Sequence, residues 1–262
     1  MTAPVKPAED PHGQSGFGVR FDWGLQGALA TSAGAAAIVV IDVLSFTTTL
    51  SVAADLGIQV FPYRFRDASA AAFAASRGAV LAVGRREAGQ GGVSLSPLSV
   101  RRATDPGGPL TVTTKLVLPS LNGAAICWQL GRAHALVVGA SLRNATACAE
   151  WIIRAARGPV AVIAAGERWP DNSLRPAVED LWGAGLVIDA LAAMGSGPLS
   201  PEAAAARASY QALGRSAAMA LGACASGREL AEAGYGEEIV MAAEIDTSRG
   251  VPVLAGDSFR VY

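Results

Sequence analysis

Residues 37–49 read AIVVIDVLSFTTT, and this stretch decides the fold class. An apolar run of Ile and Val without alternation is typical of a strand buried on both faces of a mostly parallel sheet. Asp42 lies near the end of the run, and the hydroxyl groups of Thr47 and Thr48 follow where a helix begins. The stretch therefore predicts a buried strand over residues 37–43 and a helix that starts at residue 47.

The same pairing of a short apolar run with an Ala-rich helical stretch recurs along the chain. Further strands are predicted at residues 58–63, 80–83, 115–118, 136–138 and 160–164. Helices are predicted at residues 47–56, 67–77, 124–130, 144–157 and 178–194. Buried strands that alternate with helices indicate a three-layer α/β/α fold with a mostly parallel, mixed sheet.

The two ends of the chain differ from this alternating part. Residues 1–16 mix Pro, Gly and charged residues without a period, which predicts a flexible N-terminal arm. The last third predicts extra helices at residues 201–223, 225–234 and 237–245, and a strand or extended tail near 251–254. Residues 17–262 are therefore expected to form a single α/β domain. A two-lobed arrangement, if present, would divide near residues 88–109, which are rich in Gly, Ser and Pro.

Composition excludes several classes of protein. With 21 basic and 22 acidic side chains and no basic stripe, the chain lacks the charge of a nucleic-acid binder. The most apolar stretch, residues 33–44, is too short to span a membrane, and the start has no apolar core of a secretory signal. We therefore expect a cytoplasmic protein. His12 and His134 are the two histidines, and neither lies where a Ser-His-Asp hydrolase needs its base.

Polar residues follow the predicted strands at their carboxyl ends, where ligands gather in an open α/β sheet. Besides Asp42, the loops after the later strands provide Arg86, Asn122, Gly123 and Arg143. Backbone N–H groups and hydroxyls at a helix N-terminus bind anions, and guanidinium groups bind phosphate or sulfonate oxygens. The pattern predicts an anion site at this edge of the sheet.

The segment over residues 165–180 reads AGERWPDNSLRPAVED and is unusually dense in charge for a chain with 16% charged residues. Its candidate site residues are Glu167, Arg168, Arg175, Glu179 and Asp180. This density indicates a functional role. For Glu179 a structural role also suffices, because an acidic residue in the first turn of a helix is favoured by the helix macrodipole.

Taken in order, these loops resemble one known family. The motifs are Val-Val-Ile-Asp-Val-Leu at 39–44, Gly-Arg-Arg at 84–86, Ser-Leu-Ser-Pro at 94–97, Ser-Leu-Asn-Gly at 120–123, Gly-Ala-Ser-Leu-Arg-Asn at 139–144 and Ala-Gly-Glu-Arg-Trp-Pro at 165–170, continuing to Glu179-Asp180. Across residues 37–245 the chain resembles the 2-phosphosulfolactate phosphatase family, the ComB-like proteins. The resemblance implies Mg²⁺-dependent hydrolysis of 2-phosphosulfolactate to 3-sulfolactate and phosphate, a step of coenzyme M biosynthesis. Together with the apolar composition, it also implies a homodimer.

The resemblance also suggests roles for the candidate residues. Asp42 and Asp180 would hold Mg²⁺ through hard oxygen ligands, and Glu179 would join them as a catalytic carboxylate. Substrate and phosphate would be bound by Thr47, Thr48, Arg86, Asn122, Gly123, Arg143, Glu167, Arg168 and Arg175. Either water or Asp42 would attack phosphorus, and the sequence leaves both open.

The chain departs from the family pattern at several positions. Ser45 stands where the family carries Arg, Arg85 stands where it carries Glu, and Ala125 stands where it carries a second Arg. An Asp of the family is also missing from residues 92–97. Two alternatives therefore remain: a phosphatase of the same fold for another phosphorylated carboxylate or sugar acid, and a non-catalytic anion-binding homologue.

Overall fold

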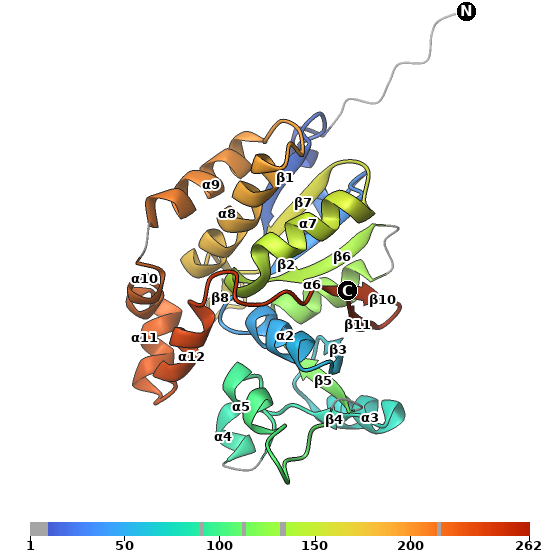
Figure 1. Ribbon diagram of the computed structural model, residues 1–262, viewed down its shortest axis with the longest axis vertical. Coiled ribbons are helices and arrows are strands. Elements are labelled where there is room, and N and C mark those ends of the chain that lie inside the picture. The colour runs from blue at the N-terminus through green and yellow to red at the C-terminus, as the bar shows by residue number, and fades with distance from the viewer. Residues whose placement is uncertain (1–9, 90–91, 112–113, 132–134, 214–215) are drawn as a thin grey trace, which may run out of the picture.

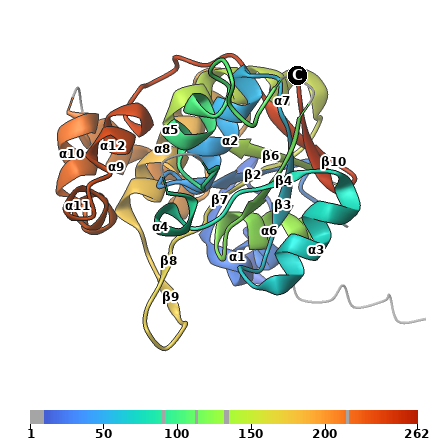
Figure 2. The ribbon, with the colours of Figure 1, turned by 90° about the horizontal axis from the view of Figure 1, so that it is seen from below.

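A nine-stranded sheet with helices on both faces forms the body of the protein (Figure 1). The structure is a computed structural model that describes residues 10–89, 92–111, 114–131, 135–213 and 216–262. In spatial order the strands are β1 (Val19–Trp23), β7 (Val160–Ala164), β2 (Ala37–Ile41), β6 (Leu136–Ala140), β10 (Pro252–Ala255), β11 (Ser258–Val261), β3 (Gln59–Tyr63), β5 (Lys115–Pro119) and β4 (Val80–Leu81). A separate hairpin, β8 (Glu167–Arg168) and β9 (Leu174–Arg175), extends away from the body (Figure 2).

The helices divide between the two faces of the sheet. The first half of the chain provides α1 (Gly24–Thr31), α2 (Phe46–Asp55), α3 (Ala68–Arg77), α4 (Arg85–Ala88), α5 (Pro97–Arg102) and α6 (Gly123–Leu130). The second half provides α7 (Ala145–Ala155), α8 (Val178–Ala193), α9 (Pro201–Leu213), α10 (Ala217–Ala223), α11 (Ala225–Glu232) and α12 (Gly236–Ala242). One core lies between the sheet and α7, α8 and α9, and a second lies between the sheet and α1, α2 and α6. The predicted α/β class is confirmed.

All six predicted strands and all five helices of the alternating part are present, with their ends shifted by one to two residues in most cases. Two predictions about the rest were incomplete, and one pair of elements was missed. Residues 201–223 form two helices, α9 and α10, instead of one. The C-terminal extended segment is a hairpin, β10–β11, inserted in the middle of the sheet. The pair β1 and α1 was not predicted.

β1 escaped prediction because its sequence, VRFDW, interrupts the apolar run with charges. Arg20 is nonetheless buried, and its guanidinium donates to the carbonyl oxygens of Thr31 and Ala33 at 3.0 and 2.8 Å. These two hydrogen bonds fix the end of α1 against β1. Burial of an arginine is acceptable where carbonyl oxygens receive its N–H groups.

Two segments predicted to be loosely organised contain regular structure where they are described. The proposed arm over residues 1–16 lies outside the described residues up to residue 9. Beyond that point, the buried side chain of Gln14 exchanges two hydrogen bonds with the backbone of Phe21, at 2.8 and 3.0 Å. The segment over residues 88–109 contains α5, and strands from before and after it belong to the same sheet.

The sheet consists of two parallel groups that run in opposite directions. β1, β7, β2 and β6 are parallel to one another, and so are β3, β5 and β4. Between the groups, β10 pairs antiparallel with β6, and β11 pairs antiparallel with both β10 and β3. In a flat sheet, the carboxyl ends of β2 and β5 would therefore lie at opposite edges.

The sheet is not flat, because the loops after β2 and β5 touch. β2 and β5 are five strand spacings apart, which amounts to about 24 Å at about 4.8 Å per spacing. Yet the amide nitrogen of Gly123, after β5, lies 2.9 Å from a carboxylate oxygen of Asp42, after β2. The sheet must curl, and α2 and α6 lie inside the curl, where each contacts strands of both groups. This curvature brings the strand-end loops into one site.

Among the residues that the structure describes, no helix combines the length and the apolar character that a membrane crossing requires.

Close packing of α8 on β2 depends on a glycine. A methyl group at Gly183 would lie 2.8 Å from the Cγ2 atoms of Ile41 and Val43, two stiff β-branched side chains. We predict that Gly183→Ala lowers the free energy of unfolding by about 1–2 kcal/mol, since overpacking outweighs the gain in helix propensity. Gly222→Ala in α10 is the matched control, because a methyl group there meets no atom within 4 Å. Urea unfolding that leaves Gly183→Ala as stable as Gly222→Ala would contradict this packing.

Candidate active site

A cavity of about 960 Å³ opens where the loops after β2, β3, β4, β5 and β7 converge. The polar side chains that line it include Asp42, Ser45, Arg66, Arg85, Arg86, Ser120, Asn122, Glu167 and Arg168. Leu230, Ala233 and Tyr235, in and just after α11, line another part of the wall. Five strand ends thus contribute to one cavity, whereas the loop after β6 does not.

Asp42 lies at the centre of this arrangement and is 5% exposed. Its Oδ1 accepts a hydrogen bond from Phe46 N at 3.2 Å. Its Oδ2 accepts from Gly123 N at 2.9 Å and from Ser120 Oγ at 3.2 Å. Phe46 and Gly123 are the first residues of α2 and α6, so two helix N-termini point at one carboxylate. Burial raises the pKa of Asp42, and these hydrogen bonds and the charge of Arg66 oppose the rise.

Gly123 is required for this contact. A methyl group at this position would lie 2.7 Å from Asp42 Oδ2 and 2.7 Å from the ring of Phe46. The Asn-Gly pair therefore marks a place where backbone approaches a carboxylate closely. The strand-end pattern predicted that the amide groups around Asn122 and Gly123 bind phosphate, whereas in the structure the amide of Gly123 donates to Asp42.

Asp180 also connects two loops but does not line the cavity. Its Oδ1 accepts from Val43 N at 2.7 Å and its Oδ2 accepts from Gly166 N at 2.8 Å. Burial, and then the negative charges of Asp42 and Glu179, raise the pKa of Asp180 well above its usual range. Asp180 thus joins the loops after β2 and β7. Its neighbour Glu179 is 3% exposed and likewise does not line the cavity.

Glu167 is a second carboxylate of the cavity and is half-buried. Its Oε2 accepts a hydrogen bond from Asn122 Nδ2 at 3.0 Å, which links the loops after β5 and β7. Burial and the negative charge of Asp42 raise the pKa of Glu167 to about 7, against the opposing effects of Asn122 and Arg175. Asp42 and Glu167 therefore act on each other electrostatically within one cavity.

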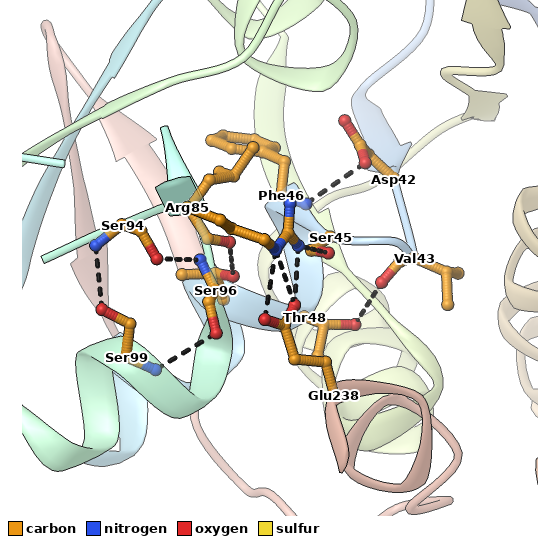
Figure 3. A network of polar contacts seen from close by, with 12 residues as sticks. Asp42, Val43, Ser45, Phe46, Thr48, Arg85, Ser94, Ser96, Ser99 and Glu238 are labelled. Carbon is orange, nitrogen blue, oxygen red and sulfur yellow. Dashed lines mark hydrogen bonds and ion pairs between the residues drawn. The ribbon is translucent and has the colours of Figure 1, made fainter. Parts of the chain in front are cut away.

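Arg85 takes part in the site through a buried ion pair. Its guanidinium donates to Ser45 Oγ at 2.6 Å and to Glu238 of α12 at 2.6–3.1 Å, and Figure 3 shows it lying between these two side chains. Glu238 is 2% exposed, so the pair carries little free charge into the cavity. Arg85 thereby places a guanidinium beside Ser45, the position where the family pattern has an arginine. Its partner Glu238 was missed because it lies in an ordinary helical stretch.

Arg66 and Arg86 are two exposed arginines of the cavity. Neither makes a hydrogen bond or an ion pair with another residue of the described part of the chain, and Arg66 is close enough to Asp42 to lower its pKa. Arg86 was predicted as a ligand residue. Arg66 was not predicted, although the loop Arg64-Phe65-Arg66-Asp67 follows β3 with the same pattern of strand and base that marked the other loops.

Arg168 and Arg175 lie on the β8–β9 hairpin. Arg168 lines the cavity and donates to the carbonyl oxygens of Leu121 and Asn172, at 3.0 and 3.2 Å. Arg175 does not line it; its guanidinium donates to Ser226 Oγ at 3.3 Å and lies 5.7 Å from the centre of the Trp169 ring. Both arginines thus attach the hairpin to the body of the protein.

Three further predicted ligand residues point elsewhere. The hydroxyl of Thr47 donates to Asp42 O at 2.8 Å and that of Thr48 to Val43 O at 2.7 Å, so both buried threonines stabilise the start of α2. Arg143 is 7% exposed and pairs with Asp55 and Glu244 at 3.3 and 3.1 Å. Arg143 therefore joins α2 to the segment after α12 and does not line the cavity.

The comparison with protein families agrees with this arrangement. The family model described as 2-phosphosulpholactate phosphatase matches residues 27–257, which include every strand-end loop of the cavity. The chain belongs to the 2-phosphosulpholactate phosphatase family. This confirms the resemblance inferred from the motifs and identifies the family as one of phosphatases. A search of curated proteins found no significant match.

Within this phosphatase family member, the described residues contain no cluster of three or more acidic, Cys or His side chains arranged to bind a metal. Hard oxygen donors that line the cavity are the carboxylates of Asp42 and Glu167, the Asn122 amide and the Ser45 and Ser120 hydroxyls. A divalent cation bound here would take at most two carboxylates from these residues.

The close approach at Gly123 gives a testable prediction. Gly123→Ala should push the backbone away from Asp42 and lower the free energy of unfolding by about 1–3 kcal/mol. Gly84→Ala is the matched control, because Gly84 lines the same cavity and a methyl group there would lie 3.9 Å from its nearest neighbour. Equal stabilities of the two variants in urea unfolding would contradict the contact.

The raised pKa of Glu167 predicts how stability changes with pH in EDTA. A carboxyl whose pKa is about 7 when folded and about 4.3 when unfolded binds its proton more tightly in the folded state. Its contribution therefore favours folding below about pH 4.3 and is lost as the pH rises to about 7. Glu167→Gln should match wild type near pH 4.5 and exceed its free energy of unfolding by about 2–3 kcal/mol at pH 8. Glu87→Gln, a change at the exposed rim, should keep the pH dependence of wild type. If Glu87→Gln shows the gain in stability at pH 8 that we predict for Glu167→Gln, the assignment is contradicted.

Proposed function

We propose that the protein is a Mg²⁺-dependent phosphatase that hydrolyses a small phosphate monoester in the cavity around Asp42. One observation carries the proposal: the cavity combines two carboxylates, Asp42 and Glu167, with two exposed arginines, Arg66 and Arg86, at the converging strand ends. Carboxylates suit a cation or a proton transfer, and guanidiniums suit phosphate oxygens. Membership of a phosphatase family supports the same reaction class.

Asp42 and Glu167 are the residues that would hold Mg²⁺. They are carboxylates of one cavity, and the hydrogen bond from Asn122 orients Glu167 as an outer contact orients a metal ligand. Mg²⁺ commonly takes one or two protein carboxylates and completes its shell with water and substrate phosphate. When bound, the ion would neutralise charge on the phosphoryl group and orient a water molecule. Asp180 is not among these proposed Mg²⁺ ligands. Both of its carboxylate oxygens accept hydrogen bonds from backbone N–H groups, and its side chain does not line the cavity.

The arginines would bind the phosphoryl group. Arg66 and Arg86 each present a planar fork of N–H donors that matches two phosphate oxygens. Since neither has an ion-pair partner in the described part of the chain, binding of a dianion would not require an existing pair to break. Arg85 differs, because Glu238 already neutralises it. Its role would be to hold Ser45 at the cavity wall.

Water is the nucleophile that these contacts favour. Both oxygens of Asp42 accept hydrogen bonds, from Phe46, Gly123 and Ser120, and such bonds stabilise the carboxylate and lower its nucleophilicity. In the proposed reaction, an oxygen of water bonds to phosphorus, the bond from phosphorus to the ester oxygen breaks, and the leaving alkoxide takes up a proton. The products are the alcohol and inorganic phosphate.

Reduction with borohydride during turnover tests the choice of nucleophile. An aspartyl phosphate at Asp42 would be reduced to homoserine, whereas attack by water leaves Asp42 unchanged. We expect peptide mass spectra with an intact Asp42. Homoserine at position 42 would show that the carboxylate attacks.

Phosphate release from purified protein tests the function itself. The panel includes 2-phosphosulfolactate, which the family description makes the first ester to assay, together with phosphorylated carboxylates, sugar acids and simple alcohols. We predict Mg²⁺-dependent turnover that stops in EDTA and falls by about 100-fold or more in Asp42→Asn and Glu167→Gln. Glu87→Gln, at the rim of the same cavity, is the matched control and should stay within about threefold of wild type.

Two results would contradict the proposal. Turnover that persists in EDTA would exclude the metal, and full activity in Asp42→Asn would exclude the assigned centre. No release from any ester, together with binding of inorganic phosphate, would favour the non-catalytic anion-binding homologue.

A further inference from the structure

The hydroxyl group of Ser45 does not cap the helix that it precedes. Ser45 comes directly before α2, and its side chain makes no capping hydrogen bond there. Ser96, directly before α5, behaves differently, because its hydroxyl accepts a hydrogen bond from Ser99 N at 3.2 Å. Ser45 is 3% exposed and lines the cavity together with Asp42. Its hydroxyl therefore serves a contact other than helix capping.

Arg85 limits where the hydrogen of this hydroxyl can point. A guanidinium carries N–H donors and no acceptor, so in the 2.6 Å contact Arg85 Nη2 donates and Ser45 Oγ accepts. The hydroxyl hydrogen of Ser45 meets no acceptor among the residues that the structure describes. A buried hydroxyl hydrogen without an acceptor is costly, and Ser45 borders the cavity. The acceptor for this hydrogen must therefore come from the contents of the cavity.

The guanidinium of Arg85 is itself held in place by α12 and the residue before it. Its Nε and Nη2 atoms donate to the carboxylate oxygens of Glu238 at 2.6–3.1 Å. Its central carbon lies 5.5 Å from the centre of the Tyr235 ring. Glu238 thus fixes Arg85, and Arg85 fixes the Ser45 hydroxyl (Figure 3). A donor that is oriented before the ligand arrives loses little conformational freedom on binding.

Ser45 lies close to the proposed metal ligand Asp42. The peptide bond between Ser45 and Phe46 supplies the N–H that donates to Asp42 Oδ1 at 3.2 Å. Ser45 Cα is two covalent bonds from that nitrogen and is therefore within about 6 Å of the carboxylate oxygen. In the proposed function, Asp42 holds Mg²⁺, and the phosphoryl group is the part of the substrate that helps to complete the shell of the ion. A phosphoryl oxygen is therefore the acceptor that suits the Ser45 hydroxyl.

We infer that Ser45 binds the substrate by donating a hydrogen bond from its hydroxyl to a phosphoryl oxygen, and that Arg85 and Glu238 are positioning residues that act through Ser45. This inference rests on the proposed function and assigns further residues to the same site. Arg66 and Arg86 would supply charge to the phosphoryl group, and Ser45 would supply a fixed neutral donor. Ser45 forms no covalent bond in this role, so its loss should weaken the binding of phosphate itself.

Titration calorimetry with inorganic phosphate in the presence of Mg²⁺ tests the contact without turnover. Ser45→Ala should raise the Kd for phosphate by about tenfold or more, which is the effect of losing one hydrogen bond to a charged group. Ser94→Ala is the matched control. Ser94 is also 3% exposed and belongs to the network drawn in Figure 3, but it does not line the cavity. The Kd of this control should equal that of wild type.

The possible results separate the inference from the proposed function. Equal Kd values for phosphate in Ser45→Ala and wild type would overturn the inference. An unchanged Kd for phosphate with a raised KM for 2-phosphosulfolactate would place Ser45 at another group of the ester. That result would overturn the inference and leave the phosphatase function intact. If wild type neither binds phosphate nor releases it from any ester, the proposed function fails, and the inference fails with it.

A neutral exchange of the ion pair tests the positioning role. Arg85→Gln combined with Glu238→Gln removes one positive and one negative charge, so the net charge of the site does not change. This double variant should raise the Kd for phosphate by about threefold or more when Ser45 is present, and should have no further effect in Ser45→Ala. Arg102→Gln combined with Glu237→Gln is the matched control. It removes an exposed ion pair between α5 and α12 and should not change the Kd.

Two results would overturn the positioning role. An equal rise of the Kd with and without the Ser45 hydroxyl would show that Arg85 acts on phosphate independently of Ser45. No rise in either case would show that Ser45 needs no support from Arg85. If the double variant does not fold, Arg85→Lys gives the same comparison, because lysine keeps the charge beside Glu238 but lacks the second arm that reaches Ser45.

Discussion

The Asp42 carboxylate joins the two halves of the sheet. It accepts hydrogen bonds from Phe46 N, at the start of α2, from Gly123 N, at the start of α6, and from Ser120 Oγ, directly after β5. A buried carboxylate is costly unless its oxygens are hydrogen-bonded, and two helix N-termini supply both donors and favourable dipoles. The same carboxylate therefore stabilises the curled sheet and faces the cavity that the curl creates. In the proposed function, substrate chemistry and folding would depend on one group.

The sequence predicted the parts of the fold that have local signals. Apolar runs predicted β2, β3, β5, β6 and β7, and Ala-rich stretches predicted the helices that follow them, because burial on both faces leaves no alternation. β1 was missed because Arg20 and Asp22 interrupt its run, although Arg20 is buried and donates two hydrogen bonds to carbonyl oxygens. The insertion of the β10–β11 hairpin between β6 and β3 has no local signal, since it depends on pairing between segments far apart in the chain.

For the candidate site, the strand-end rule selected Asp42, Arg86, Asn122, Glu167 and Arg168, and all five line the cavity. The rule also selected Thr47, Thr48 and Asp180, whose side-chain oxygens form hydrogen bonds with backbone groups. Which oxygen of a carboxylate is already occupied depends on how the sheet curls, and a linear pattern contains no such information. Arg143 was selected by the same rule, yet the loop after β6 lies outside the cavity.

In the proposed function, Asp42 and Glu167 form the metal end of the cavity, and Arg66 and Arg86 form its phosphate end. A crystal structure with Mn²⁺ and a non-hydrolysable phosphonate, with anomalous scattering measured for manganese, tests both ends directly. We predict one manganese peak in contact with carboxylate oxygens of Asp42 and Glu167, and phosphonate oxygens in contact with Arg66 and Arg86. A manganese peak at Asp180 and Glu179, or a phosphonate bound away from both arginines, would contradict it.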